Sequence, residues 1–230
     1  MKTKLASLTQ KTALLVLLEN VGHIHGLNLP RWMRAIIDFI SEAYAKFILR
    51  LYGAHRRYDR VVILEDAEAN GKLLASTLLD LSQTYEIDIF LLVHGLEKGL
   101  VGFRGKPIKG ETFGPLLDRV LGHPLNLRVV YGLNCYGSSL AETWQALGAK
   151  AVCGANGVNW FPEPGLSGFL LAWFSGRSFT QSVAQSNRAM LWVGRRLLGE
   201  EHVGVKSSTL HVFGAGANLK APKTNDVKGA

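Results

Sequence analysis

Two polar residues stand where runs of β-forming residues end, and their side chains could together carry out acyl transfer. His94 follows the segment DIFLLV and precedes Gly95, and Cys135 ends the segment LRVVYGLNC. A parallel strand that is apolar on both faces delivers the residue after it to the carboxyl edge of the sheet, where open α/β folds build their sites. If the two strands are parallel neighbours, the thiol and the imidazole face one substrate. The pattern therefore predicts a nucleophile and its base.

The two cysteines of the chain have different sequence settings. Cys135 lies between a strand end and a predicted helix start, where unpaired N–H groups and the helix dipole favour the thiolate. Cys153 falls inside a run of small apolar residues, which is typical of a buried, unreactive cysteine. Two cysteines cannot build a disulfide framework, so we expect a reducing, cytoplasmic setting.

Metal chemistry has little support in the sequence. His23 and His25 form an isolated His-x-His pair with no third ligand nearby. A protein zinc site needs three or four such ligands. We therefore expect no metal and no cofactor.

The bulk composition is that of a single α/β domain. The chain has 230 residues and 47% hydrophobic content, enough for one substantial core. The formal net charge is +8, but the basic residues of the amino-terminal quarter are interspersed with apolar ones. This pattern favours a solvated face over a nucleic-acid-binding stripe. The apolar run 13–18 ends at Glu19 without a cleavage pattern, and no run is long enough to span a bilayer, so we expect a buried strand there.

Strand-like and helix-like segments alternate along the chain. This alternation predicts a three-layer α/β sandwich with a mostly parallel six-stranded sheet. We expect one domain over 1–213 and a flexible tail over 214–230. The expected strands are 13–18, 60–64, 87–93, 125–133, 149–154 and 208–213. The expected helices are 31–52, 67–83, 114–122, 165–175 and 180–198, with a further short helix opened by a capping box of Ser139 and Glu142.

With these elements in order, the sequence resembles the caspase–haemoglobinase fold of caspases, metacaspases, gingipains, separase and CHAT-domain proteins. The resemblance covers about residues 13–213, and it is carried by His-Gly after the third strand and a cysteine after the fourth. Within that group, the segment LNCYGSSLAETWQALGAKAVCGANGVNW is most similar to the CHAT pattern.

The resemblance implies a cysteine endopeptidase that acts on a peptide or protein substrate through a Cys-His dyad. Cys135 would attack the carbonyl to form a thioester, and His94 would protonate the leaving amine and then activate water. The backbone N–H groups of Gly95 and Cys135 would bind the oxyanion. No third triad member is required in this family.

The substrate preference is less defined. Asn134 precedes the nucleophile in place of the alanine of the caspase signature, so aspartate specificity is unsupported, although Asn134 itself could contact substrate. Leu133 stands where metacaspases place an acidic residue. The acidic residues that could bind a Lys or Arg side chain of the substrate are Glu65, Asp66 and Glu163. The first two are equally typical of a helix start.

Two other functions are compatible with the sequence. The chain could be a catalytically inert binding or regulatory module with a protein partner, or a homodimer paired through exposed apolar residues of its last helices. It could also be an α/β-hydrolase with Cys135 as nucleophile and His202 or His211 as base. That fold requires a small residue two positions before the nucleophile, where this chain has Leu133.

Overall fold

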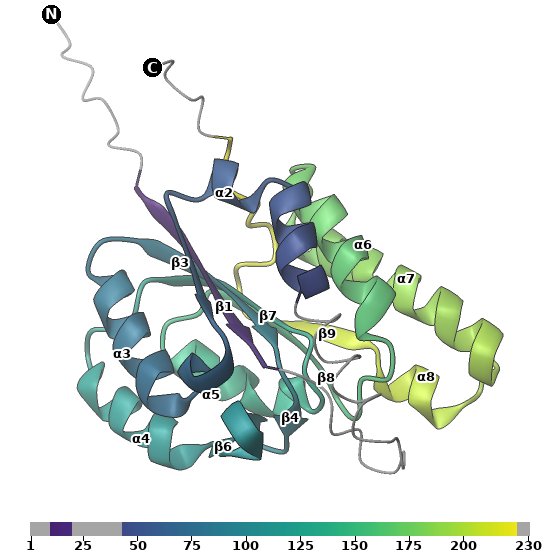
Figure 1. Cartoon of the computed structure of the whole chain (residues 1–230), viewed down its shortest axis with the longest axis horizontal. Coiled ribbons are helices and arrows are strands. Elements are labelled where there is room, and N and C mark those ends of the chain that lie inside the picture. The colour runs from purple at the N-terminus through teal and green to yellow at the C-terminus, as the bar shows by residue number, and fades with distance from the viewer. Residues whose placement is uncertain (1–9, 20–42, 225–230) are drawn as a thin grey trace, which may run out of the picture.

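A six-stranded sheet forms the centre of the computed structural model, which describes residues 10–19 and 43–224 (Figure 1). The strand order is β2-β1-β3-β7-β8-β9. Only β9 runs antiparallel to its neighbour; the other pairs are parallel. The predicted fold class is therefore confirmed. The strands are β1 Thr12–Leu18, β2 Arg60–Leu64, β3 Glu86–Leu92, β7 Leu127–Gly132, β8 Ala151–Ala155 and β9 Leu210–Phe213.

The middle strands are rich in apolar residues because both faces of the sheet are covered. All seven residues of β1 are buried. Leu14 and Val16 contribute to the core on one face, and Leu15 and Leu17 contribute to the core on the other. Parallel sheets occur in this doubly covered setting, which explains why their strands appear in the sequence as continuous hydrophobic runs.

Helices cover both faces of the sheet and complete the three layers (Figure 1). No helix among residues 10–19 and 43–224 is long and apolar enough to cross a membrane. One face carries α3 Gly71–Ser82, α4 Gly110–Arg119 and α5 Ala141–Ala146; the other carries helical residues 43–51, α6 Pro162–Phe174 and α7 Phe179–Leu198. The shorter elements are α2 Ala54–Arg57, α8 Val203–Ser207, the 3-10 turns η1 Asp66–Glu68, η2 Phe103–Gly105 and η3 Gly137–Leu140, and a small sheet of β4 Gly95–Leu96, β5 Gly99–Val101 and β6 Pro107–Ile108.

Several predicted helix boundaries differ from the structure. The helix predicted to open at Gly114 instead begins at Gly110, with Pro115 inside it. Burial of Phe113 on one side holds this first turn, and Pro115 is exposed, so water can replace the hydrogen bond that its ring removes. The helix predicted over 67–83 is divided into η1 and α3, because the Asn70 side chain accepts from Leu73 N (2.9 Å) and caps a new helix. Of the helix predicted over 31–52, residues 31–42 lie outside the described residues.

Residues 214–222, called the strap below, lie along the amino edge of the sheet. Gly216 N donates to Lys150 O (2.7 Å), and Phe179 N donates to Leu219 O (2.7 Å). Leu219 and Ala221 pack against the core under α6 and α7. Two apolar side chains and several backbone groups of the strap, a segment that the sequence places in the predicted tail, thus find partners on the domain.

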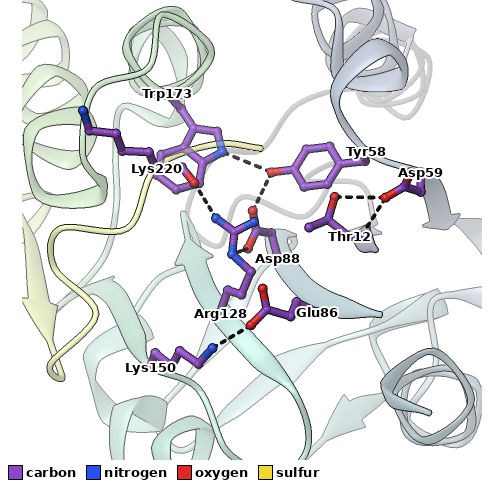
Figure 2. A network of polar contacts seen from close by, with 9 residues as sticks. All are labelled: Thr12, Tyr58, Asp59, Glu86, Asp88, Arg128, Lys150, Trp173 and Lys220. Atoms are coloured by element: carbon purple, nitrogen blue, oxygen red, sulfur yellow. Dashed lines mark hydrogen bonds and ion pairs between the residues drawn. The ribbon is translucent and has the colours of Figure 1, made fainter. Parts of the chain in front are cut away.

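A buried polar network joins the strap to the sheet (Figure 2). Tyr58 Oη donates to Asp88 Oδ2 (2.6 Å), and Trp173 Nε1 donates to Tyr58 Oη (3.1 Å). Arg128 Nε lies 3.5 Å from Asp88 Oδ1, and the same guanidinium donates to the carbonyl of Lys220 in the strap. Burial raises the pKa of Asp88 from its ordinary 3.8 to about 6, even though Arg128 and Tyr58 favour the carboxylate.

This raised pKa predicts how stability depends on pH. The folded state binds the Asp88 proton more tightly than the unfolded state, so the stability that protonation contributes is complete below pH 3.8 and is lost as the pH rises through about 6. Its full size is about 3 kcal/mol. Denaturant unfolding between about pH 4 and about pH 7 should show this loss in the parent chain and not in Asp88→Asn. The control Glu111→Gln, on an exposed turn of α4, retains Asp88, so its free energy of unfolding should fall with pH as in the parent chain. The same fall in Asp88→Asn would contradict the assignment to Asp88.

The strap contacts predict the effect of truncation. A chain ending at Phe213 loses the packing of Leu219 and Ala221 and leaves the Arg128 guanidinium without the Lys220 carbonyl. We expect its free energy of unfolding to fall by about 2–4 kcal/mol. A chain ending at Thr224 retains the whole strap and should unfold like the full chain. Equal stability of the two truncations in denaturant would show that the strap contributes nothing.

Candidate active site

The carboxyl ends of β3 and β7 bring the two chemistry-bearing residues to one edge. The strands are parallel neighbours, as the sequence predicts, with Leu91 opposite Gly132. Leu133 N also donates to Leu91 O (3.1 Å), so the pairing continues past the end of β7. His94 lies two residues beyond β3, and Cys135 lies three residues beyond β7.

The backbone that follows His94 packs directly against the backbone of Cys135. A Cβ atom placed on Gly95 would lie 1.8 Å from the Cys135 carbonyl oxygen, so no other residue fits here without moving the chain. The same carbonyl accepts from Asn134 Nδ2 (3.2 Å). The glycine of the His-Gly pair is therefore required for this close approach.

Ser139 fastens the hairpin after His94 to the turn after Cys135. Its hydroxyl accepts from Lys98 N (2.8 Å), at the β4–β5 turn, and donates to Tyr136 O (2.6 Å). The predicted capping box of Ser139 and Glu142 is therefore wrong. Helix α5 begins at Ala141 with no side-chain cap, because the serine hydroxyl is engaged by the site loops.

The N–H group of Gly95 is not used by the β4–β5 ladder. Val101 N donates to His94 O (2.9 Å), and Gly95 lies opposite Leu100 in the antiparallel register. In such a ladder, hydrogen-bonded and non-hydrogen-bonded pairs alternate, so the N–H of Gly95 points away from β5. This is the orientation that an oxyanion donor requires.

The sulfur of Cys135 has a hydrogen-bond donor that the sequence did not reveal. Asn159 N donates to Cys135 Sγ (3.3 Å), and Asn159 is held there because its Nδ2 donates to Leu133 O (2.9 Å) and its Oδ1 accepts from Phe161 N (3.2 Å). The 3-10 turn η3 begins two residues after the cysteine, and the predicted helix begins further along the chain. Tyr136 adopts a left-handed conformation (φ 52°) after the cysteine, and α5 begins only at Ala141. The Asn159 N–H group supplies the polar contact.

Glu19 is a second residue of this edge that the sequence analysis did not select. It directly follows β1, the neighbour of β3, and Glu19 N donates to Leu92 O (3.3 Å). Its side chain is partly buried at the same carboxyl edge as His94. The signal was present, since Glu19 is a polar residue at the end of an apolar strand, the criterion that selected His94 and Cys135.

The predicted substrate-binding residues lie in different environments. Asn134 is 1% exposed, so its amide holds the loop and does not face solvent. Glu65 forms an ion pair with Lys46 (2.8 Å), whereas Asp66 is exposed at the start of η1, two strands from β3. Glu163 lies in the first turn of α6, where burial raises the pKa of its carboxyl group.

Cys153, His202 and His211 have no described contact with Cys135 or His94. Cys153 is 1% exposed inside β8, and burial raises the pKa of its thiol. His202 Nδ1 accepts from Gly204 N (3.0 Å) at the start of α8. His211 lies on the outermost strand β9, two strands from β7. The structure therefore brings neither alternative base to Cys135 by a described contact.

Sheet order, connectivity and the two strand ends together define a caspase-like α/β fold. Two solved structures share it: the Arg-specific cysteine proteinase gingipain R, with TM-score 0.61 and 14% identity over 91% of this chain, and the complex of the Porphyromonas gingivalis RgpB pro- and mature domains, with TM-score 0.60 and 14% identity over 92%. The chain covers 47% and 49% of those proteins, about half their length. No family model and no curated protein matches the sequence, and the narrower resemblance to CHAT-domain proteins has no support here.

The different burial of the two thiols predicts selective alkylation. Iodoacetamide should modify Cys135 in the native protein and leave Cys153 intact, because the second thiol is enclosed and its pKa is raised. Peptide mapping by mass spectrometry after brief exposure measures this directly. Cys135→Ser should stay unlabelled until denaturant is added. Native labelling of Cys153 would contradict the assignment.

Proposed function

We propose that the protein is a cysteine peptidase that cleaves peptide bonds through Cys135 and His94. The observation that carries the proposal is the close packing of the His94–Gly95 segment against the Cys135 backbone at the carboxyl edge of a caspase-like sheet. The two gingipain structures support the proposal through their fold, since both belong to cysteine proteinases.

The reaction follows from the chemistry of these two groups. The Cys135 thiolate attacks the scissile carbonyl carbon, and the carbonyl π electrons move to its oxygen. When the tetrahedral intermediate collapses, the C–N bond breaks and His94 donates a proton to the departing amine, which leaves a thioester. His94 then takes a proton from water, whose oxygen attacks the thioester. The acid product leaves, and the thiolate is regenerated.

Backbone donors would stabilise the negative charge that forms on the carbonyl oxygen. The Gly95 N–H points away from the β4–β5 ladder, and the Cys135 N–H is the second proposed donor. Donors fixed by the surrounding fold need no reorganisation when the charge develops, which is why such sites lower the barrier. Asn134 and Ser139 are positioning residues in this proposal, since each contacts the backbone of the nucleophile loop.

Aromatic side chains beside the nucleophile and an acidic side chain at the same sheet edge suggest which residues of a substrate this edge would bind. Tyr136 and Trp160 are 37% and 51% exposed, and each directly follows a residue of the site, Cys135 or Asn159. Asp66 is exposed at the same sheet edge, and one structural neighbour is described as Arg-specific. We propose that a basic side chain precedes the cleaved bond, with Asp66 as the first candidate to bind it and Glu65 and Glu163 as the others.

A positional peptide library tests activity and preference together. The assay is run in reducing buffer, which matches the cytoplasmic setting inferred from two unpaired cysteines. We expect turnover by the parent chain, highest with Arg or Lys before the cleaved bond, and loss of at least about a thousandfold in kcat/KM for Cys135→Ala and His94→Ala. A peptidyl acyloxymethyl ketone should label the parent and Cys153→Ala, but not Cys135→Ala.

The controls separate this proposal from its alternatives. Cys153→Ala should keep full turnover, because that thiol is buried in β8. Turnover that survives Cys135→Ala would exclude this nucleophile. The regulatory module would be favoured if the folded parent chain cleaves no library member and takes no label, yet captures a defined protein partner. The α/β-hydrolase would be favoured if His211→Ala abolishes turnover and His94→Ala does not.

A further inference from the structure

Cationic side chains from three distant parts of the chain converge at one corner of the amino edge of the sheet. We call this surface the basic corner and define it by Arg50, Arg56, Arg57, Arg177, Lys220 and Lys223. Two contacts hold these parts together: Arg57 Nη1 donates to Pro222 O (3.2 Å), and Ser178 forms a β-bridge with Lys220. The Arg57 guanidinium also lies 5.7 Å from the ring centre of Phe174, at the end of α6.

Acidic side chains are nearly absent from the segments that build this corner. Residues 43–60, 174–178 and 218–224 contain one, Asp59, whose carboxylate accepts from Thr12 N (2.8 Å). Asp88 lies beneath the corner, but it is fully buried and paired with Arg128. The positive charge is therefore not neutralised by the surrounding surface, and it is complementary to an anionic partner.

Large apolar side chains are exposed beside these cations. Phe47 and Leu51, one helical turn apart on residues 43–51, are 59% and 65% exposed. The turn after this helix, in which Gly53 N donates to Arg50 O (2.9 Å), leads directly into α2 (Figure 1). The apolar pair and the basic corner therefore form a continuous surface.

We propose that this surface docks onto an anionic lipid membrane, with Phe47 and Leu51 entering the headgroup boundary. Cations draw a protein to the negatively charged leaflet, and exposed bulky apolar residues insert beside them. The apolar pair favours a lipid surface over nucleic acid, since phosphates and bases offer nothing for an exposed Leu to enter. Peripheral docking of this kind needs no spanning helix.

The position of the corner adds a functional consequence. α2 directly precedes β2, and the strap donates from Gly216 N to the carbonyl of Lys150 just before β8, so the corner lies at the amino edge of the sheet. His94 and Cys135 lie beyond the carboxyl ends, about 20 Å away along strands of this length. A protein docked by the basic corner would hold its candidate active site away from the lipid, open to substrates in solution. This inference does not depend on the peptidase proposal.

Vesicle co-sedimentation of the full chain tests the proposal. We expect binding to vesicles of phosphatidylcholine mixed with phosphatidylserine, little binding to phosphatidylcholine alone, and weakening as salt is raised. The variant Arg56→Gln/Arg177→Gln/Lys223→Gln should bind roughly 100-fold more weakly, since each cation near such a surface contributes about fivefold. The variant Phe47→Ser/Leu51→Ser should bind the anionic vesicles about tenfold more weakly or worse, and this loss of affinity should be largely independent of salt.

A charge-matched variant on the opposite edge isolates the surface from net charge. Arg104→Gln/Lys106→Gln/Lys109→Gln removes the same three charges at exposed positions around β6 and should bind nearly as well as the parent. Equal weakening of the two triple variants would overturn the proposal in favour of net charge alone. The proposal would also be overturned by equal binding to neutral and anionic vesicles, or by no binding to either kind of vesicle in low salt. Tight binding of a single-stranded oligonucleotide together with no binding to vesicles would overturn it as well. Circular dichroism verifies that each variant is folded.

Discussion

The parallel pairing of β3 with β7 is the constraint on which the candidate site depends. It sets the carboxyl ends of two central strands side by side, and Leu133 N extends the pairing to Leu91 O beyond the last strand residue. The chain can then turn over Gly95, whose missing side chain admits the Cys135 carbonyl. A one-residue slip of β7 would move Cys135 away from this contact and would also exchange the two buried faces of the strand. The packing of β7 side chains into two different cores therefore also fixes the register of the candidate site.

The polar groups at the two edges of the sheet differ in how far they are buried. At the amino edge, Asp88 and Arg128 are buried: Tyr58 donates to one carboxylate oxygen of Asp88, Arg128 lies 3.5 Å from the other, and Arg128 also donates to the strap carbonyl of Lys220. At the carboxyl edge, the thiol of Cys135 is partly exposed and accepts from the Asn159 N–H group. Closed, satisfied polar groups stabilise and specify packing, whereas a partly open thiol is free to react. The fold thus keeps its structural polar cluster at one end of the strands and its candidate chemistry at the other.

The parts of the fold that local pattern determines were predictable from sequence. β1, β3 and β7 are rich in apolar residues because both faces of the sheet are covered, and strand-end placement selected His94 and Cys135. The strap was not predictable, because two apolar residues in a glycine-rich, polar segment carry no periodic signal. Their partners lie on elements far away in the chain. The Asn159 N–H contact with sulfur was hidden for a similar reason, since every backbone N–H is the same in a sequence until the fold places one of them.

The placement of Asn159 also explains how the surroundings of the nucleophile are held rigid. Its side chain bonds the end of β7 through Leu133 O and the start of α6 through Phe161 N, so its N–H has little freedom to move away from Cys135 Sγ. On the other side, Ser139 connects the loop to the hairpin that follows His94. Three segments that leave β3, β7 and β8 are thus held together by backbone-directed hydrogen bonds. Such bonds depend on chain geometry more than on side-chain identity, so the fold that supports them can be shared with gingipain R at 14% identity.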